Sequence, residues 1–586
     1  MTAVVNPMTR EDVRMIKSGD IVEWSSSDKA GERIGLVLGP LDGSEHLIIA
    51  AAQWGESSAN NITIPAEDLT VLSETSQFSL RVWCQDTVSL ESEELVVIGH
   101  ANESSLTRVL RERTKADARW FYDAYHVPRR PQANFDTVGY SGRVFDHREV
   151  EFAVDASLDF WLTMGRFSDR LQRNLSEYMG VRRTLLVNSG SAANLLAVSA
   201  LTSPLLGDRA LKPGDEVITT ACGFPTTVNP IIQNDCVAVL VDTDPISGNV
   251  DVDHLERALS PRSKAVILAH ALGNPFNVER VVKFCEENDL WLIEDTCDAL
   301  GSTYRGKCVG SFGDLSTLSF YPAHHITMGE GGGVNVVSDP KLQRIVESFR
   351  DWGRDCWCKS GQDNVCGRRF SYPLGDLPPG YDHKFMYSHI GYNLKPTDWQ
   401  AAIGCAQFEK IDEFNRLRRR NWGHLRKVFE PYEEFFELPV PESDSDPSWF
   451  GFKVLLRPNA PFSRNDLVSY LEVHRIQTRM MFAGNLARQP AYVGRLRADG
   501  SSVLRVPDSL DGADRIMNDS FFMGVYPGLT DQHVERVQDV LEAFMCDVLN
   551  GGGSSERGAS DLRLAARDLS PRRQAFRGTR WGTESS

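Results

Sequence analysis

Two adjacent histidines, His324 and His325, stand before a glycine-rich turn at residues 329–333. Imidazole titrates near neutral pH, so either side chain could move a proton or bind a metal ion. A histidine pair without a third ligand nearby is seldom a metal site, which favours proton chemistry. The glycines permit backbone conformations that other residues resist, and this is consistent with a close approach to a bound group.

Small and acidic residues follow two other apolar runs. Ser189, Gly190 and Ser191 open a predicted helix, where free backbone N–H groups and the helix dipole favour a phosphate. An ordinary serine-capped helix is the alternative interpretation. Asp295 and Asp298 follow the apolar run LWLIE. A carboxylate there could pair with a heterocyclic nitrogen or a metal ion, or it could cap the next turn.

The cysteines are unevenly distributed. Of the 11 in the chain, Cys356, Cys358 and Cys366 lie close together in the sequence. In a reducing compartment such clustering indicates metal or catalytic chemistry rather than disulfide bonds. Scattered cysteines such as Cys236 and Cys285 are expected to be small buried side chains.

The elements that must position these residues are short buried strands alternating with helices. Strand–helix alternation of this kind predicts an α/β fold with a mainly parallel sheet and helices on both faces. Ligands bind such sheets at the carboxyl ends of the strands, so the loops there are the place to look for a site. The seven predicted strands cover residues 184–188, 216–220, 237–242, 264–270, 290–295, 315–320 and 333–337.

At 586 residues the chain is too long for one compact unit, so additions to this core are expected. Short apolar runs broken by Gly, Ser and Asn predict a β-rich N-terminal addition of unknown role. A Gly/Ser/Arg-rich C-terminal tail is expected to be disordered. The predicted regions are residues 1–110 (the β-rich addition), 116–410 (a large α/β domain), 411–546 (a small α+β domain) and 551–586 (the tail).

The net charge of −17 argues against binding to nucleic acid or to an anionic membrane surface. No apolar run approaches the length of a membrane span, and the N-terminus lacks the apolar stretch of a secretory signal. The expected location is therefore the cytoplasm.

Several segments resemble the DegT/DnrJ/EryC/StrS sugar aminotransferase family, among them NSGSAANL, LIEDTCDALGS, SFYPAHHITMGEGGGV and GYNLKPTDWQAAIG. The resemblance implies the PLP-dependent transferase fold type I. In that family the segment before GEGG resembles S-F-x-x-x-K, and its lysine binds pyridoxal phosphate covalently. Five residues after Ser319, this chain has His324 instead.

Loss of the lysine implies that pyridoxamine 5′-phosphate is the working cofactor. His324 could then move a proton at the C4′ carbon of the cofactor. The resemblance accordingly implies a 3-dehydrase that removes the C3 hydroxyl of a nucleotide-linked 4-keto-6-deoxyhexose. An ordinary aminotransferase and a non-catalytic scaffold are the rival interpretations, and His324 argues against the first of them.

By the same resemblance, Asp295 pairs with the pyridine nitrogen, Phe224 stacks on the ring, and Asp298 lies near the 3-hydroxyl group. Asn393 is expected to reach the phosphate in a neighbouring subunit, which implies a homodimer. The phosphate itself would be held by three small residues: Gly190, Ser191 and Ser319.

The cysteines distinguish two groups of such dehydrases. Cys356, Cys358 and Cys366, with Cys297 upstream, resemble the [2Fe–2S] motif of the dehydrases that act on CDP-4-keto-6-deoxyglucose. This resemblance implies an NAD(P)H-dependent flavin/iron–sulfur reductase or a ferredoxin as electron donor. Zinc bound by the same four residues, Cys308 as the fourth ligand, and a cluster-free dehydratase remain alternatives.

Overall fold

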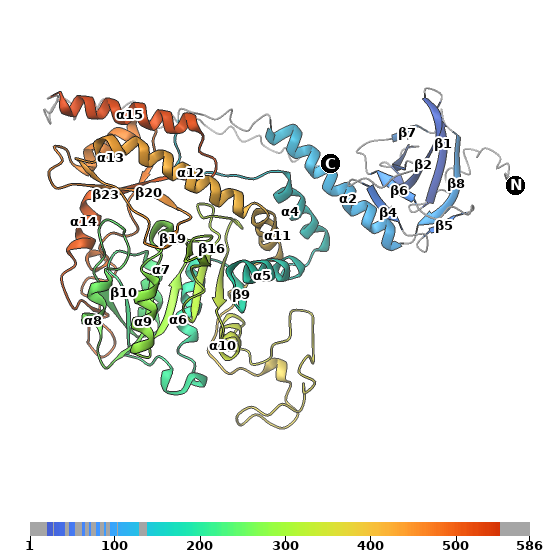
Figure 1. The fold of residues 1–586 in the computed structure, drawn as a ribbon. Helices are drawn as coiled ribbons and strands as arrows, with labels where there is room; N and C mark the ends of the chain where they lie inside the picture. Colours follow the sequence, from blue (N-terminus) through green and yellow to red (C-terminus); the bar gives the residue numbers. More distant parts are fainter. Residues whose placement is uncertain are drawn as a thin grey trace, which may run out of the picture. The chain divides into compact units, whose positions relative to one another are not determined.

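The computed structural model describes residues 103–127 and 137–550 and, before them, strand segments between residues 20 and 101 (Figure 1). The chain divides into two compact units, residues 1–132 with 145–162 and residues 133–144 with 163–586. The predicted disordered tail, 551–586, lies outside the described residues. Among the described residues, no helix combines the length and the apolar character needed to cross a bilayer.

The first unit contains an antiparallel sheet with the strand order β4-β6-β3-β2-β1-β8-β5, and β7 pairs with β3. Its helices are α2 (Glu103–Phe121), the π-helical turn η2 (Tyr122–His126) and α4 (His147–Asp159). The strands are β1 (Asp20–Ser26), β2 (Lys29–Pro40), β3 (His46–Ala52), β4 (Asn61–Ile64), β5 (Leu69–Val71), β6 (Phe78–Arg81), β7 (Thr87–Ser89) and β8 (Glu94–Ala101).

The second unit is built on an eight-stranded sheet with the order β22-β11-β10-β12-β13-β16-β17-β9. Strands β22 to β16 in this order are parallel, while β17 runs antiparallel to both of its neighbours. All seven predicted strands are present, and the predicted α/β fold is confirmed. The strands are β9 (Arg183–Val187), β10 (Glu216–Thr220), β11 (Val237–Val241), β12 (Ser263–Ala269), β13 (Trp291–Asp295), β16 (Leu315–Ser319), β17 (Gly332–Val336) and β22 (Leu504–Arg505).

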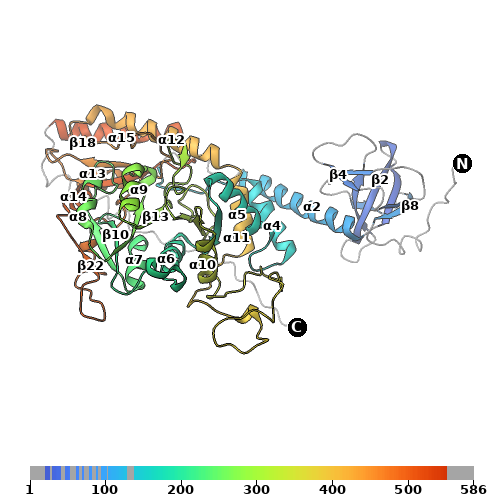
Figure 2. The ribbon, with the colours of Figure 1, turned by 60° about the horizontal axis from the view of Figure 1, so that its bottom comes forward.

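Helices cover this sheet on both faces (Figure 2). Alternate strand residues point to opposite faces, so neighbouring residues such as Val217 and Ile218 belong to two different apolar clusters. Helices α6 (Gly190–Ala200), α7 (Pro225–Gln233) and α10 (Pro340–Arg350) contribute side chains to the first cluster. Helices α8 (Leu255–Ala258) and α9 (Val278–Glu287) contribute side chains to the second. Burial on both faces explains why these strands are continuous apolar runs.

The remaining elements form a smaller α+β part around a third apolar cluster. Its sheet has the order β18-β20-β23-β21, and helices α12 and α15 lie side by side over it (Figures 1 and 2). The elements are α12 (Ile411–Phe429), β18 (Phe436–Glu437), β20 (Gly451–Leu456), α13 (Arg464–Val473), β21 (Thr478–Arg479), α14 (Asp511–Asp519), β23 (Ser520–Gly524) and α15 (Asp531–Leu549). The two-residue strand β22 leaves this part and pairs with β11 of the large sheet, so residues 411–546 contribute to both sheets.

Two further features flank the carboxyl edge of the large sheet. Helices α5 (Arg166–Met179) and α11 (Asp398–Phe408) pack against each other. A small sheet joins β14 (Thr303–Tyr304) to β15 (Lys307–Cys308) and β19 (Ser445–Asp446).

Candidate functional site

Three loops meet at the carboxyl ends of β9, β13 and β16. A Cβ atom on Gly190, the first residue of α6, would lie 2.5 Å from the Cβ of Ser319 and 3.2 Å from the Sγ of Cys297. Only glycine fits this position without a shift of its neighbours. The predicted phosphate residues at the ends of β9 and β16 are therefore close together in space.

The glycine-rich turn after His324 also contains a glycine that permits close packing. A Cβ atom on Gly332 would lie 2.5 Å from the carbonyl carbon of Ser189. The predicted close approach of these glycines to a bound group stays a prediction, and at Gly332 the close neighbour is the backbone at the end of β9. The absence of a side chain lets β17 pack directly against the start of α6.

Asp295, at the end of β13, is a buried carboxylate surrounded by neutral hydrogen-bond donors. It accepts from Asn194 Nδ2 and Thr227 Oγ1, each at 2.8 Å, and from the Cys297 backbone N–H at 3.2 Å. In the part of the chain that the structure describes, no basic side chain forms an ion pair with it. A buried charge without an opposite charge is costly, so this arrangement suits a ligand that carries a protonated nitrogen.

His324 and His325 have different environments. Nδ1 of His324 lies 3.3 Å from Oδ1 of Asp298, and the two side chains are 15% and 12% exposed. His325 is buried, and its Nε2 donates to the carbonyl oxygen of Ser448 at 2.8 Å. Burial, reinforced by the nearby Arg418 cation, lowers the pKa of His325 well below its usual value. His325 is therefore a neutral structural residue, and His324 is the one paired with a carboxylate.

Arg418 holds the loop that contains His324 by hydrogen bonds to its backbone. This buried side chain of α12 donates to the carbonyl oxygens of His324 at 2.8 Å, Ala323 at 3.3 Å and Trp449 at 3.3 Å. Burial lowers the pKa of Arg418 to about 10. The ring of Phe450 lies 5.1 Å from that of His324, so Arg418 joins the two segments that enclose the histidine. Arg418 could not be predicted from the sequence, because nothing distinguishes it from the other arginines of this helix.

The other predicted cofactor residues lie around the same strand ends. Ser189 caps α6 by accepting the Ala192 backbone N–H at 3.0 Å, which leaves Ser191 exposed at the helix start. Phe224 precedes α7 and is 52% exposed, an unusual position for a large apolar ring. Asn393 is exposed and forms a backbone bridge to Asp351.

The structure does not assemble the four predicted cluster cysteines. Cys297 is partly buried beside Asp295. Its loss of contact with water, and next the charge of that carboxylate, raise the pKa of its thiol well above the usual value. Cys308, the alternative fourth ligand, donates to the carbonyl oxygen of Tyr178 at 3.4 Å and is part of β15. Within residues 103–127 and 137–550, no three His, Cys, Asp or Glu side chains are arranged to hold a metal ion.

The three remaining cysteines occupy one loop between α10 and α11. Each sulfur accepts a backbone N–H at 3.4 Å, donated by Cys358 to Cys356, by Val365 to Cys358 and by Arg368 to Cys366. Burial, together with the neighbouring sulfurs, raises the pKa of the Cys356 thiol. Donors of this kind stabilise thiolates, but the three side chains are not arranged to hold a metal ion together.

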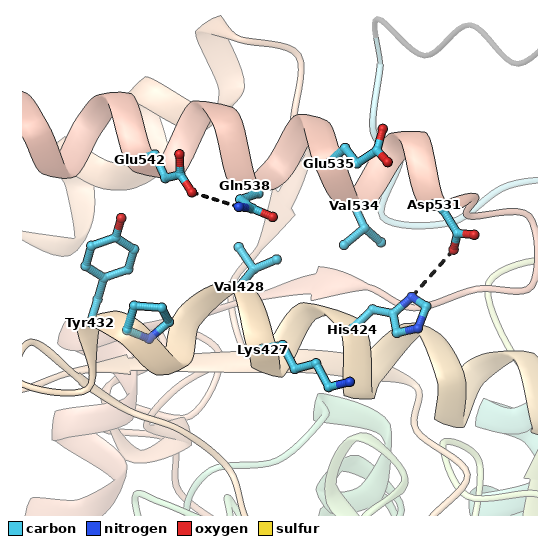
Figure 3. Close-up of a pocket in the computed structure, with 10 residues that line it drawn as sticks. His424, Lys427, Val428, Tyr432, Asp531, Val534, Glu535, Gln538 and Glu542 are labelled. Atoms are coloured by element: carbon cyan, nitrogen blue, oxygen red, sulfur yellow. Dashed lines mark hydrogen bonds and ion pairs between the residues drawn. The ribbon is translucent and has the colours of Figure 1, made fainter.

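A groove on the outer surface of α12 and α15 is separate from these residues (Figure 3). His424 and Asp531 form a 3.5 Å ion pair there, with side chains that are 38% and 71% exposed. None of the predicted site residues lines this groove.

Comparison with known proteins is consistent with this geometry. The chain is 53% identical over 404 residues to "Lipopolysaccharide biosynthesis protein RfbH" of Salmonella typhimurium, which covers 69% of this chain and 91% of the relative. It is 48% identical over 405 residues to "dTDP-4-dehydro-2,6-dideoxy-D-glucose 3-dehydratase" of Saccharopolyspora spinosa, covering 69% and 86%.

The solved structure of the Escherichia coli GDP-4-keto-6-deoxy-D-mannose-3-dehydratase with bound hydrated PLP is similar, with a TM-score of 0.61 and 25% identity. That match covers 69% of this chain and 99% of the other. The sequence profile of the DegT/DnrJ/EryC1/StrS aminotransferase family matches residues 145–542. The chain therefore belongs to the DegT/DnrJ/EryC1/StrS aminotransferase family.

Proposed function

We propose that the protein is a pyridoxamine-phosphate-dependent 3-dehydrase of a nucleotide-linked 4-keto-6-deoxyhexose. The observation that carries this proposal is the His324–Asp298 pair in a loop that contains no lysine. Two similar proteins are named as 3-dehydratases of keto-deoxysugar nucleotides, at 48% and 30% identity. The name of the similar E. coli structure includes bound hydrated PLP, which supports this class of cofactor.

When bound, the cofactor would supply an electron sink for the reaction. Asp295 would accept a hydrogen bond from the pyridine nitrogen and keep it protonated. His324 would take the proton at C4′, and Asp298 would stabilise the resulting imidazolium. Arg418 holds the backbone carbonyl of His324 and so fixes the position of the ring.

Residues at the ends of β9 and β16 are proposed to bind the cofactor phosphate. The start of α6 offers backbone N–H groups at the buried Gly190 and the exposed Ser191, and Ser319 offers its hydroxyl. The half-exposed ring of Phe224 is available to cover the pyridine. Asn393, which is exposed in the single chain, is proposed to reach the site of a second subunit in a homodimer.

We further propose that a [2Fe–2S] cluster delivers the electrons that the reaction requires. Replacing a C3 hydroxyl by hydrogen consumes two electrons and two protons and releases one water molecule. The proposed source is an NAD(P)H-dependent flavin/iron–sulfur reductase or a ferredoxin. Cys356, Cys358 and Cys366 would supply three thiolates, a proposal supported by their N–H···S hydrogen bonds, and Cys297 is the proposed fourth.

A cluster-free dehydratase is the second candidate. It is favoured by the separation of Cys297 from the cysteine loop and by the absence of a metal-binding group among the described residues. Such an enzyme would hydrolyse the eliminated product and would recover its amine from glutamate.

One set of measurements distinguishes these candidates. Anaerobically purified protein is expected to contain roughly two irons and two labile sulfides per chain, as a [2Fe–2S] cluster requires. The Cys358→Ser variant should lose them. A panel of nucleotide-linked 4-keto-6-deoxyhexoses, supplied with NADH and a generic reductase, should yield a 3-deoxy product.

Three results would contradict the proposal in different ways. Stoichiometric zinc would exclude electron transfer through the cysteines. A 3-deoxy product formed with glutamate by iron-free protein would favour the cluster-free dehydratase. A pyridoxal phosphate adduct that resists dialysis and is trapped by borohydride would indicate an ordinary aminotransferase.

A further inference from the structure

The groove between α12 and α15 has rims of opposite charge (Figure 3). Its α15 side is lined by the carboxylates of Asp531, Glu535 and Glu542, and its α12 side by His424 and Lys427. Lys427 and Glu535 form no ion pair among the residues that the structure describes. A segment that fits the groove should therefore carry cations along one flank and carboxylates along the other.

Apolar side chains lie between these rims. Val428 of α12 and Val534 of α15 both line the groove and come from the facing sides of the two helices (Figure 3). Pro431 and Tyr432, in the turn that follows α12, extend this apolar surface. A segment that fits the groove should therefore also present a stripe of apolar side chains between its charged flanks.

The C-terminal region, which lies outside the described residues, contains a sequence with such a stripe. Residues 561–569 have the sequence DLRLAARDL. In a helix each residue advances by about 100°, which brings Leu562, Ala566 and Leu569 to the same side. Pro571 follows two residues later, where a helix commonly stops. The pattern is that of a short amphipathic helix.

The charged residues of this sequence lie on the two flanks that the groove requires. With the same advance per residue, Arg563 and Arg567 fall on one flank of the apolar stripe. Asp561 and Asp568 fall on the opposite flank. In one of the two directions along the groove, the arginines would face the acidic rim of α15 and the aspartates the basic rim of α12.

The overall charge of the C-terminal region agrees with this fit. Residues 551–586 contain seven arginines, four acidic residues and no lysine, so they are net positive in a chain whose net charge is −17. Helix α15 has five acidic side chains and one arginine. The segment and the helix beside which it would lie therefore attract each other.

The segment can reach the groove from its own chain. Helix α15 ends at Leu549, about 10 Å along its axis from Glu542 and about 27 Å from Asp531, at about 1.5 Å per residue. Residues 550–560 can extend over roughly 36 Å. A flexible linker this short gives an effective concentration of about 1 mM, so even a weak contact would form within one molecule.

We propose that residues 561–569 dock as a helix in the groove between α12 and α15 of the same chain. The apolar stripe covers Val428 and Val534, Arg563 and Arg567 face α15, and the aspartates face Lys427. The polar composition of the region provides too little apolar burial for a fold of its own, so the groove supplies the order. The inference does not depend on the proposed function, because the groove contains none of the predicted site residues.

Hydrogen–deuterium exchange of the full-length protein tests this contact. If the isolated segment bound with a Kd of about 0.1 mM, the effective concentration of about 1 mM would dock about nine-tenths of the molecules. The amides of residues 561–569 should then exchange about tenfold more slowly than those of an unstructured chain. Unprotected amides in the wild-type protein would overturn the proposal.

Charge reversal on α15 identifies the groove as the docking surface. Glu535→Lys combined with Glu542→Lys should remove the protection of residues 561–569. The matched control is Asp539→Lys combined with Asp547→Lys, which reverses two exposed carboxylates of the same helix outside the groove and should retain the protection. Equal loss in both double variants would show a general attraction to α15 and overturn the docking site.

The reciprocal exchange separates docking from a general loss of structure. Arg563→Glu combined with Arg567→Glu should also remove the protection. Adding these two changes to Glu535→Lys and Glu542→Lys should restore it, because the signs on both surfaces are then reversed together. Failure of the fourfold variant to regain protection would contradict the proposed pairing.

A cross-linking measurement on the wild-type protein shows which copy supplies the segment. A carbodiimide joins an amine to a carboxylate that it contacts, so Lys427 should be joined to Asp561 or Asp568. In a mixture of ¹⁴N and ¹⁵N protein these cross-links should connect peptides of one isotope. Mixed-isotope cross-links would place the segment of a second copy in the groove, and cross-links of Lys427 only to other carboxylates would leave the groove without it; either result overturns the proposal.

Discussion

Replacing Asp298 by asparagine tests whether this carboxylate stabilises the charged form of His324. The two facing atoms are 3.3 Å apart, and both side chains are largely shielded from water. At an effective dielectric constant of about 20, unit charges about 4 Å apart attract by about 4 kcal/mol. The residual exposure of both groups reduces the net value to about 1.5–3 kcal/mol, the range for hydrogen bonds to charged groups.

Asparagine retains the shape of the side chain but carries no charge. The imidazolium formed when His324 takes the C4′ proton would lose this stabilisation, so the rate should fall by roughly ten- to a hundredfold. The assay mixes the variant with pyridoxamine phosphate deuterated at C4′ and with the keto sugar, and follows the release of deuterium in a single turnover. This readout is independent of the electron donor. Absorbance titration should show that the variant still binds the cofactor.

Asp531→Asn is the matched control. This substitution neutralises the carboxylate of another Asp–His pair, the exposed His424–Asp531 pair at 3.5 Å on α12 and α15 (Figure 3). Exposed ion pairs contribute about 0–1 kcal/mol, so deuterium release should be unchanged. If Asp298→Asn releases deuterium within about twofold of the wild-type rate, the role assigned to Asp298 is wrong.

Four further substitutions separate chemistry from stability. His324→Leu should abolish deuterium release. His325→Leu should retain it and lose about 1–3 kcal/mol in the free energy of unfolding, since the buried Ser448 carbonyl loses its donor. The opposite pattern would exchange the roles of the two histidines. Gly190→Val should prevent binding of pyridoxamine phosphate, because the valine Cβ would lie 2.5 Å from the Cβ of Ser319. Equilibrium dialysis measures this binding. Unaltered binding would show that the start of α6 is not the phosphate site. Burial lowers the pKa of Lys453 to about 8, so the ammonium group loses its proton at a lower pH in the folded chain than in the unfolded chain. The protein's free energy of unfolding should therefore rise by about 3 kcal/mol as the pH increases from about 8 to 10.5. Urea titrations measure this rise, and the Lys453→Met variant should lack it.

The sequence predicted the large sheet well because its strands are buried on both faces. The run of β11, Val237–Val241, is continuously apolar, and this pattern depends little on the rest of the chain. The strand β22 was missed because two residues, Leu504 and Arg505, contain no periodicity. Its pairing with β11 is decided by tertiary contacts far from it in sequence.

The site could be predicted in part for a similar reason. Counting from Ser319 identifies His324 as the residue in the lysine position, but only the fold shows that His325 turns towards Ser448. Asn194 and Thr227, which donate to Asp295, and the buried cation of Arg418 come from separate elements and leave no local pattern. The predicted association of Cys297 with the cysteine loop came from the resemblance and stays a prediction.

The hydrogen bonds of Arg418 also determine when the loop that contains His324 can be held in place while the ribosome makes the chain. The guanidinium joins the carbonyl oxygens of Ala323 and His324 to that of Trp449, a residue made much later. At about 5–20 residues per second, a ribosome needs on the order of ten seconds to proceed from the first segment to the last. During that interval the loop that contains His324 lacks the hydrogen bonds of Arg418. A chain released or stalled within this interval would already contain every strand from β9 to β17, yet it could not hold His324 in place. The nascent large domain would therefore be a natural client for a chaperone until the C-terminal part is made.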